Sequence, residues 1–69
     1  MNYVLKYSSG EFVGEDRDSG GYPYPTRYLS CARMFDIKDE AKIYLTRLMY
    51  QFPDQKFDPN IFEVSISRV

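Results

Sequence analysis

The chain has 69 residues, enough for one small domain, and a formal net charge of −1 with 28% charged residues. This near-neutral balance is neither the basic field of a typical nucleic-acid-binding domain nor the strong acidity of a DNA mimic. Histidine is absent and there is one cysteine, which excludes an intrachain disulfide, the usual His/Cys zinc site and nucleophilic catalysis with a His base.

A chain of this length forms a domain that buries only about 60% of the surface exposed by its unfolded form, so we expect marginal stability. Association is the expected extra support, and a homodimer is weakly favoured. No apolar run approaches the length of a membrane span, and Lys6 interrupts the first apolar residues, so we expect no signal peptide. A single free thiol fits a reducing compartment, and we expect a cytoplasmic location.

Residues 2–7 alternate as a half-buried strand does. Tyr3, Leu5 and Tyr7 are expected on one face, with Val4 and Lys6 on the other. A turn at residues 8–10, where Gly10 is free to adopt positive φ, leads into a return strand at residues 11–14. The sequence therefore predicts an N-terminal β-hairpin.

Residues 15–26 have the composition of a loop, dense in charge, Gly and Pro and without periodicity. A loop this long in so small a domain is either disordered or functional. Its first half is acidic, and the spacing Asp16-x-Asp18-x-Gly20 resembles the start of a calcium loop. The third oxygen ligand and the final glutamate of such a loop are missing, so we expect no metal site.

Residues 27–34 are predicted to form a third strand in either of two registers. One register buries Leu29 and Cys31, and the other buries Tyr28, Ala32 and Met34. Among apolar neighbours, Cys31 is interpreted as a small buried hydrophobic side chain rather than a reactive thiol.

Residues 36–52 show the clearest periodicity in the chain and predict an amphipathic helix. Asp36 is the expected N-cap, and Pro53 is expected to end the helix. At 100° per residue one apolar stripe forms, consisting of Ile37, Ala41, Tyr44, Leu45, Leu48 and Phe52, with Met49 at its edge.

The chain then continues through a polar connection, residues 54–60, from which Phe57 is expected to fold back onto the core. Residues 61–68 alternate as a strand. The expected inward residues are Phe62, Val64 and Ile66, and the expected outward residues are Glu63, Ser65 and Ser67.

We therefore predict a single α+β domain over residues 1–69, with the order β-β-(β)-α-β. A small antiparallel sheet of three to four strands would carry the helix on one face only. The opposite face would be mostly polar, showing Val4, Lys6, Glu63, Ser65 and Ser67.

Two groups of side chains are candidate partner-binding residues. The aromatic part of the 15–26 loop and the residues after it supply Tyr22, Tyr24, Arg27 and Tyr28. These side chains could anchor a protein interface, stack on bases beside a phosphate, or fold down to cover the core.

The outer side of the predicted helix supplies Ile43, Arg47 and Tyr50. They are interpreted either as isolated apolar residues on a surface or as a contact strip with Arg47 between two anchors. We identify no catalytic residue, expect no cofactor, and do not expect an enzyme.

The stretches YVLKYSSGEF, ARMFDIKDEA and IFEVSI give most of the chain a resemblance to small single-domain proteins of bacteriophages and prophages. The resemblance implies a non-enzymatic protein that acts in the cytoplasm of a host bacterium. Several such proteins block host defences, as anti-CRISPR proteins do, by occupying a surface of their target.

The first hypothesis is accordingly a protein-binding module, a phage-type inhibitor that blocks a host or defence protein sterically or allosterically. The second is a binder of a nucleotide or a single-stranded nucleic acid through the aromatic loop. The third is a self-associating structural protein.

Overall fold

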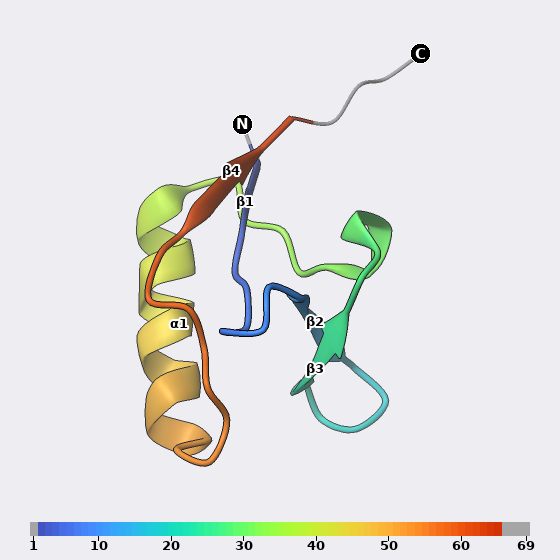
Figure 1. Cartoon of the computed structure of the whole chain (residues 1–69), viewed down its shortest axis with the longest axis vertical. Helices are drawn as coiled ribbons and strands as arrows, with labels where there is room; N and C mark the ends of the chain where they lie inside the picture. Colours follow the sequence, from blue (N-terminus) through green and yellow to red (C-terminus); the bar gives the residue numbers. More distant parts are fainter. Residues whose placement is uncertain (1, 66–69) are drawn as a thin grey trace.

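Residues 2–65 are described by a computed structural model, in which one α-helix lies along one side of a set of short strands (Figure 1). The strands are β1 (Asn2–Val4), β2 (Phe12–Asp16), β3 (Tyr22–Thr26) and β4 (Phe62–Val64). The helices are the 3₁₀ helix η1 (Leu29–Cys31) and the α-helix α1 (Lys38–Gln51). The predicted α+β class, with an antiparallel arrangement of strands and one helix, is confirmed. No helix among these residues is long and apolar enough to cross a membrane.

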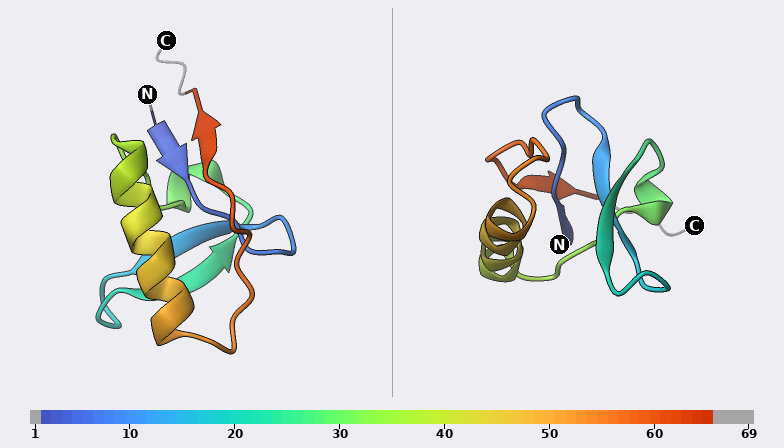
Figure 2. Two further views of the ribbon diagram at one scale, coloured as in Figure 1. Left: turned by 90° about the vertical axis from the view of Figure 1, so that its left-hand side faces the viewer. Right: turned by 90° about the horizontal axis from the view of Figure 1, so that it is seen from below.

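The strands form two antiparallel ladders of two strands each, β1 with β4 and β2 with β3. Isolated bridges connect the ladders to each other and to the segments around them, including Lys6 with Phe12 and Tyr7 with Phe57. Figure 2 shows the β2–β3 ribbon running across the direction of β1 and β4, with α1 on the other side of the core.

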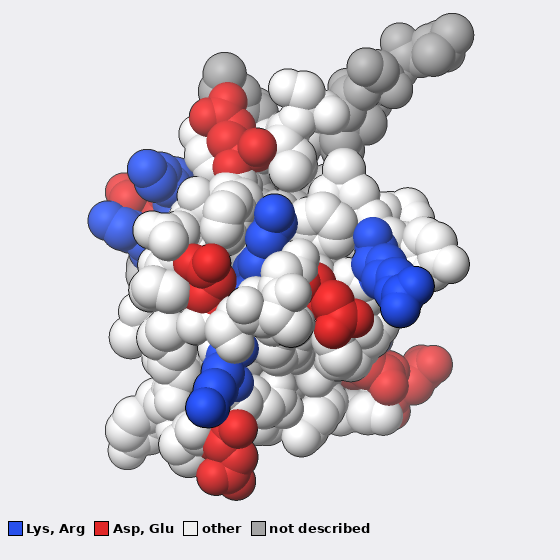
Figure 3. Space-filling view, in the orientation of Figure 1, with Lys and Arg blue, Asp and Glu red and all other residues white. Residues whose placement is uncertain are grey.

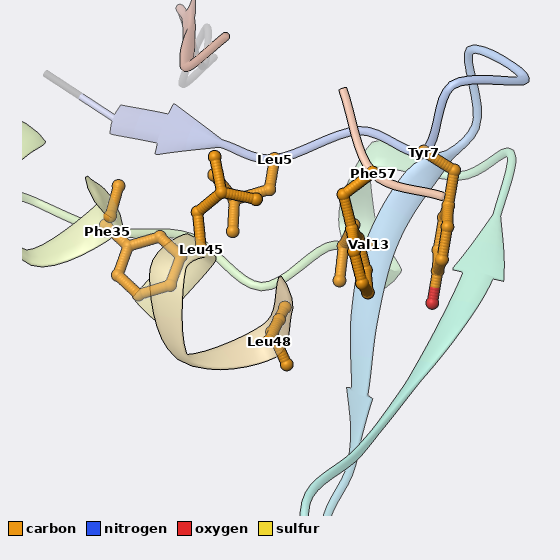
Figure 4. Packing of buried hydrophobic residues seen from close by; sticks show 8 residues of the cluster. Leu5, Tyr7, Val13, Phe35, Leu45, Leu48 and Phe57 are labelled. Atoms are coloured by element: carbon orange, nitrogen blue, oxygen red, sulfur yellow. The ribbon is translucent and has the colours of Figure 1, made fainter. Parts of the chain in front are cut away.

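The core draws side chains from the N-terminal segment, β2, the segment before α1, α1 itself and the connection that follows it (Figure 4). Its cluster of buried residues consists of Leu5, Tyr7, Val13, Phe35, Ala41, Leu45, Leu48 and Phe57. The rings of Tyr7 and Phe57 stack with their centroids 4.9 Å apart. The expectation that Phe57 folds back onto the core is thus confirmed.

The predicted helix is confirmed, and its apolar stripe faces the core: Ala41, Leu45 and Leu48 are buried. The prediction that Asp36 is the N-cap was wrong. Ile37 is the N-cap, with extended backbone (φ −119°) and no side-chain capping bond. Because Ile37 lies outside the helix, the angular spacing of the stripe does not apply to it, and its side chain is 54% exposed.

Residues 15–26 are not the loop that the sequence predicts, because β2 continues to Asp16 and residues 22–26 form β3 opposite it. The prolines are compatible with this strand. Pro25 lies opposite Val13, whose N–H donates to the Leu5 carbonyl and whose carbonyl accepts from the Arg33 N–H, both at 3.0 Å. Since the polar backbone groups of Val13 point away from β3, the ladder requires no N–H from Pro25.

Residues 27–34 are not the predicted third strand. The Cys31 N–H donates to the Tyr28 carbonyl at 3.0 Å, and the Ala32 N–H donates to the Leu29 carbonyl at 3.1 Å. These local bonds form η1 and use donors that a ladder would need. Strand alternation therefore does not apply, and Cys31 is exposed, so its interpretation as a buried hydrophobic residue was wrong.

The N-terminal segment forms the predicted turn, with Gly10 at φ +96°, but strict alternation fails in the strand before it. Val4 and Leu5 are adjacent, and both are fully buried. The β1–β4 ladder stops at Val4, so the alternation of a strand does not extend to Leu5. The expectation that Val4 lies on an open polar face was wrong.

The C-terminal strand is confirmed as β4, and its Glu63 is exposed as expected. Phe62 and Val64 are half-buried. The ammonium group of Lys6 lies over the Phe62 ring, 4.4 Å from its centroid, so this face of the β1–β4 ladder is partly covered. The predictions for Ile66 and Ser67 fall outside the described residues.

Candidate functional site

The outer side of α1 presents the helix surface, which we define as Ile43, Arg47 and Tyr50. The Ile43 side chain is 70% exposed and that of Tyr50 is 87% exposed, the highest values among the large hydrophobic residues of the described chain. With Lys42 and Thr46 they line a shallow, mostly apolar depression. The sequence predicted this placement, because the positions are one to two turns apart on the side opposite the buried stripe.

Arg47 lines the depression at the helix surface and also two neighbouring depressions. A second shallow depression beside Arg47 is lined by Arg33, Phe35, Glu40, Ile43 and Tyr44. A third lies between α1 and the β2–β3 turn, where Arg47 and Gln51 face Gly20 and Gly21. Residues missed by the sequence analysis therefore belong to this region, and Glu40, which lies two turns before Arg47, could have been found from helical spacing.

A polar cluster lies beneath this region and supports α1. Arg33 forms an ion pair with Glu15, and both side chains are largely covered. The Arg33 guanidinium lies 5.1 Å from the ring centroid of Phe35 and 5.0 Å from that of Tyr44. Burial raises the pKa of the Tyr44 hydroxyl, the charge of Glu15 adds to that effect, and Arg33 and Arg47 oppose it.

Gly21 allows the Glu15 carboxylate to sit against the β2–β3 turn. Its φ is +83°, and a Cβ there would lie 3.1 Å from Glu15 Oε1. Because Glu15 and Arg33 are 18 positions apart, no local sequence pattern predicts this ion pair. The cluster is a structural device that fixes β2 and the segment before α1 beneath the helix.

The Tyr22 side chain makes aromatic and hydrogen-bond contacts within the domain. Its ring meets the Phe52 ring edge-on, with centroids 5.0 Å apart and an interplanar angle of 76°. Its hydroxyl accepts a hydrogen bond from Gln55 Nε2 at 3.3 Å, and Gln55 Oε1 accepts one from the Tyr7 hydroxyl at 3.1 Å. Tyr22 thus ties β3 to the C-terminal end of α1, with 49% of its side chain exposed.

Tyr24 covers a glycine on the neighbouring strand. It lies directly opposite Gly14, and a Cβ on Gly14 would stand 2.7 Å from Tyr24 Cζ. The half-buried ring therefore occupies the space that a side chain at position 14 would fill. Both tyrosines of the 15–26 segment are engaged within the domain.

Arg27 and Tyr28 form a separate exposed group, which we call the turn surface. Tyr28 is 69% exposed, and its N–H donates to Thr26 Oγ1 at 3.2 Å. The turn surface adjoins η1, and Figures 1 and 2 place η1 and α1 at opposite sides of the molecule. The structure therefore does not bring the predicted partner-binding residues into one patch.

Acidic and basic groups are interspersed on the face drawn in Figure 3. In the part of the chain that the structure describes, no three His, Cys, Asp or Glu side chains come together as metal ligands would. The carboxylate of Asp16, the first residue of the calcium-like spacing, accepts hydrogen bonds from neighbouring residues. Its Oδ1 accepts from the Asp18 N–H at 3.1 Å, and its Oδ2 accepts from Ser19 Oγ at 3.0 Å.

Comparisons of this chain with protein-family models, with curated proteins and with solved structures found no match.

Proposed function

We propose that this protein is a non-enzymatic protein-binding module. The observation that carries the proposal is the exposure of Ile43 (70%) and Tyr50 (87%) around Arg47 on an ordered helix. Tyrosine and arginine are enriched among the residues that dominate protein interfaces. A tyrosine held on a helix supplies a large contact area and loses little conformational freedom on binding.

The shape of the region also supports a macromolecular partner. The depression at the helix surface is open and shallow, and it is bordered by the aliphatic and cationic groups of Lys42 and Arg47. Small-molecule sites usually enclose most of their ligand. An open, mostly apolar surface of this kind favours the surface of another protein as the partner.

Our more specific proposal is an inhibitor that binds a host or defence protein in the cytoplasm of a bacterium, by steric or allosteric block. This step depends on the resemblance to small phage proteins. The turn surface, Arg27 and Tyr28, is the second candidate contact for such a target. Nucleotide binding through Tyr22 and Tyr24 gains no support, because Tyr22 packs on Phe52 and Tyr24 covers Gly14.

Affinity capture followed by cross-linking tests the proposal. Bait proteins would be the wild type, Tyr50→Ala and Tyr28→Ala, with Lys56→Ala as a control at an exposed position outside both candidate surfaces. Loss of an interface anchor costs about 2 kcal/mol or more, so one tyrosine variant should lose at least about tenfold of a specific partner. The Lys56 variant should retain it. Equal recovery of every protein by all the baits would contradict the proposal.

A further inference from the structure

Two opposite charges flank the centre of the helix surface. Glu40 and Arg47 are both exposed, and both line the same depression as Ile43. They are seven residues apart, which on an α-helix means two turns, about 10 Å along the axis and about 20° around it. Ile43 lies between them, so one side of α1 runs from acidic through apolar to basic.

These charges are available to a partner. Within residues 2–65 the only ion pair is Arg33 with Glu15, so neither Glu40 nor Arg47 has an oppositely charged partner there. Asp39 adds a further negative charge in the first turn of α1, and no basic residue occupies the last turn. Along this side of α1 the carboxylates of Asp39 and Glu40 therefore lie towards the N-terminal end and Arg47 lies towards the other end, with Lys42 bordering the apolar depression between them.

We propose that the helix surface binds a second copy of this chain, with the two α1 helices antiparallel. This inference rests on the proposed function and names the partner of its main surface. A two-fold axis beside Ile43 brings Glu40 of one copy opposite Arg47 of the other, and the same pair forms again across the axis. A two-fold interface requires this kind of self-complementarity, in which one patch meets itself.

The apolar residues fit the same arrangement. Ile43, near the axis, meets its own counterpart in the second copy. Tyr50 lies beyond Arg47 and reaches the start of α1 in the other chain. There its hydroxyl can donate a hydrogen bond to the carboxylate of Asp39 or of Asp36. Burial of these two side chains also supplies the apolar area that a 69-residue domain lacks on its own.

Dimerisation through α1 leaves the turn surface free. Since η1 lies at the opposite side of the molecule from α1 (Figure 2), Arg27 and Tyr28 of both copies remain exposed in the dimer. The dimer would present two identical turn surfaces to a target, which increases its effective affinity when both engage.

Charge reversal tests the inference by sedimentation velocity over a concentration series. In Arg47→Glu, two glutamates face each other at each end of the interface, and in Glu40→Lys a lysine faces Arg47. Each variant alone should dimerise at least about tenfold more weakly than the wild type, since like charges repel across an interface. The double variant should recover the wild-type affinity to within about threefold.

Mixing the two single variants gives the sharpest result. Between unlike chains every charge pair is complementary, so the mixture should form heterodimers although neither variant pairs well with itself. Lys56→Glu, which makes the same charge change at an exposed position outside α1, should leave the wild-type dimer intact. Circular dichroism of each variant checks that the fold is retained.

A monomeric wild type would overturn this inference. If that monomer captured a protein that Tyr50→Ala lost, the proposed function would still stand, and if it captured none, both would fail. A wild-type dimer that neither single reversal weakens would overturn the helix-to-helix arrangement.

Discussion

At the residue scale, Gly14 shows how the absence of a side chain on one strand lets an aromatic ring, that of Tyr24, pack against the strand instead of binding a ligand. The Tyr24 ring fills the space above Gly14, on the strand opposite. In the sequence these residues are ten positions apart, and only the strand register reveals that they meet. Because the sequence does not show this contact, it allowed the hypothesis that Tyr22 and Tyr24 are free to stack on bases.

Gly14→Ala should destabilise the protein, because its Cβ would lie 2.7 Å from Tyr24 Cζ and 3.0 Å from the Cys31 carbonyl oxygen. Overpacking of this kind costs about 1 to 3 kcal/mol in the free energy of unfolding. Urea denaturation measures the change. In a Tyr24→Ala background the same substitution should cost less, because only the close approach to the Cys31 carbonyl oxygen remains. An equal cost in both backgrounds would contradict the contact with Tyr24.

Burial, the largest cause, raises the pKa of Tyr7 from 10.0 to about 12, with smaller contributions from Tyr22, Tyr44 and Glu11. Between pH 10 and 12 the unfolded chain has released this proton while the folded chain retains it. The ionisation of Tyr7 should therefore leave the free energy of unfolding independent of pH below about pH 10 and should lower it as pH rises towards about 12.

Denaturation curves at several pH values above 9 measure this decline for the wild type and for Tyr7→Phe. The variant lacks the hydrogen bond to Gln55 at every pH, so it should be less stable at pH 9 but should decline less steeply. Part of the slope should remain, because the pKa of Tyr44 is raised as well. Identical slopes in the two proteins would show that Tyr7 ionises alike in both states.

At the element scale, α1 could be predicted because helical periodicity is local: the buried positions 41, 45 and 48 follow from spacing alone. β3 could not, since two prolines normally argue against a strand. They are tolerated because alternate positions of β3 point their backbone N atoms away from β2. η1 was missed because residues 29–31 carry no pattern that separates a 3₁₀ turn from a short strand.

Adjacent positions on α1 should respond differently to truncation. Leu48 is 2% exposed within the core cluster, whereas Met49 is 41% exposed. Leu48→Ala should lower the free energy of unfolding by about 2 to 5 kcal/mol, since it leaves a cavity. Met49→Ala should cost less than about 1 kcal/mol. Thermal and urea denaturation measure both, and similar losses would mean that α1 is rotated from the orientation described.

At the scale of the whole molecule, two ladders and one helix share a single small core (Figure 4). This arrangement separates the helix surface from the turn surface. The residues of the helix surface could be named from sequence, because one local element carries them all. Their position relative to Arg27 and Tyr28, and the Glu15–Arg33 pair beneath them, depend on long-range contacts that no linear spacing encodes.

The most direct test of the central claim, that two copies of the chain pair through the helix surface of α1, is a series of ¹H–¹⁵N correlation spectra over increasing concentrations of the wild-type protein. We predict concentration-dependent shifts for the amides from Glu40 to Tyr50, with those of Arg27 and Tyr28 unchanged, and loss of these shifts in Arg47→Glu. Spectra that do not change with concentration, or shifts confined to the turn surface, would contradict an antiparallel pairing of α1 helices.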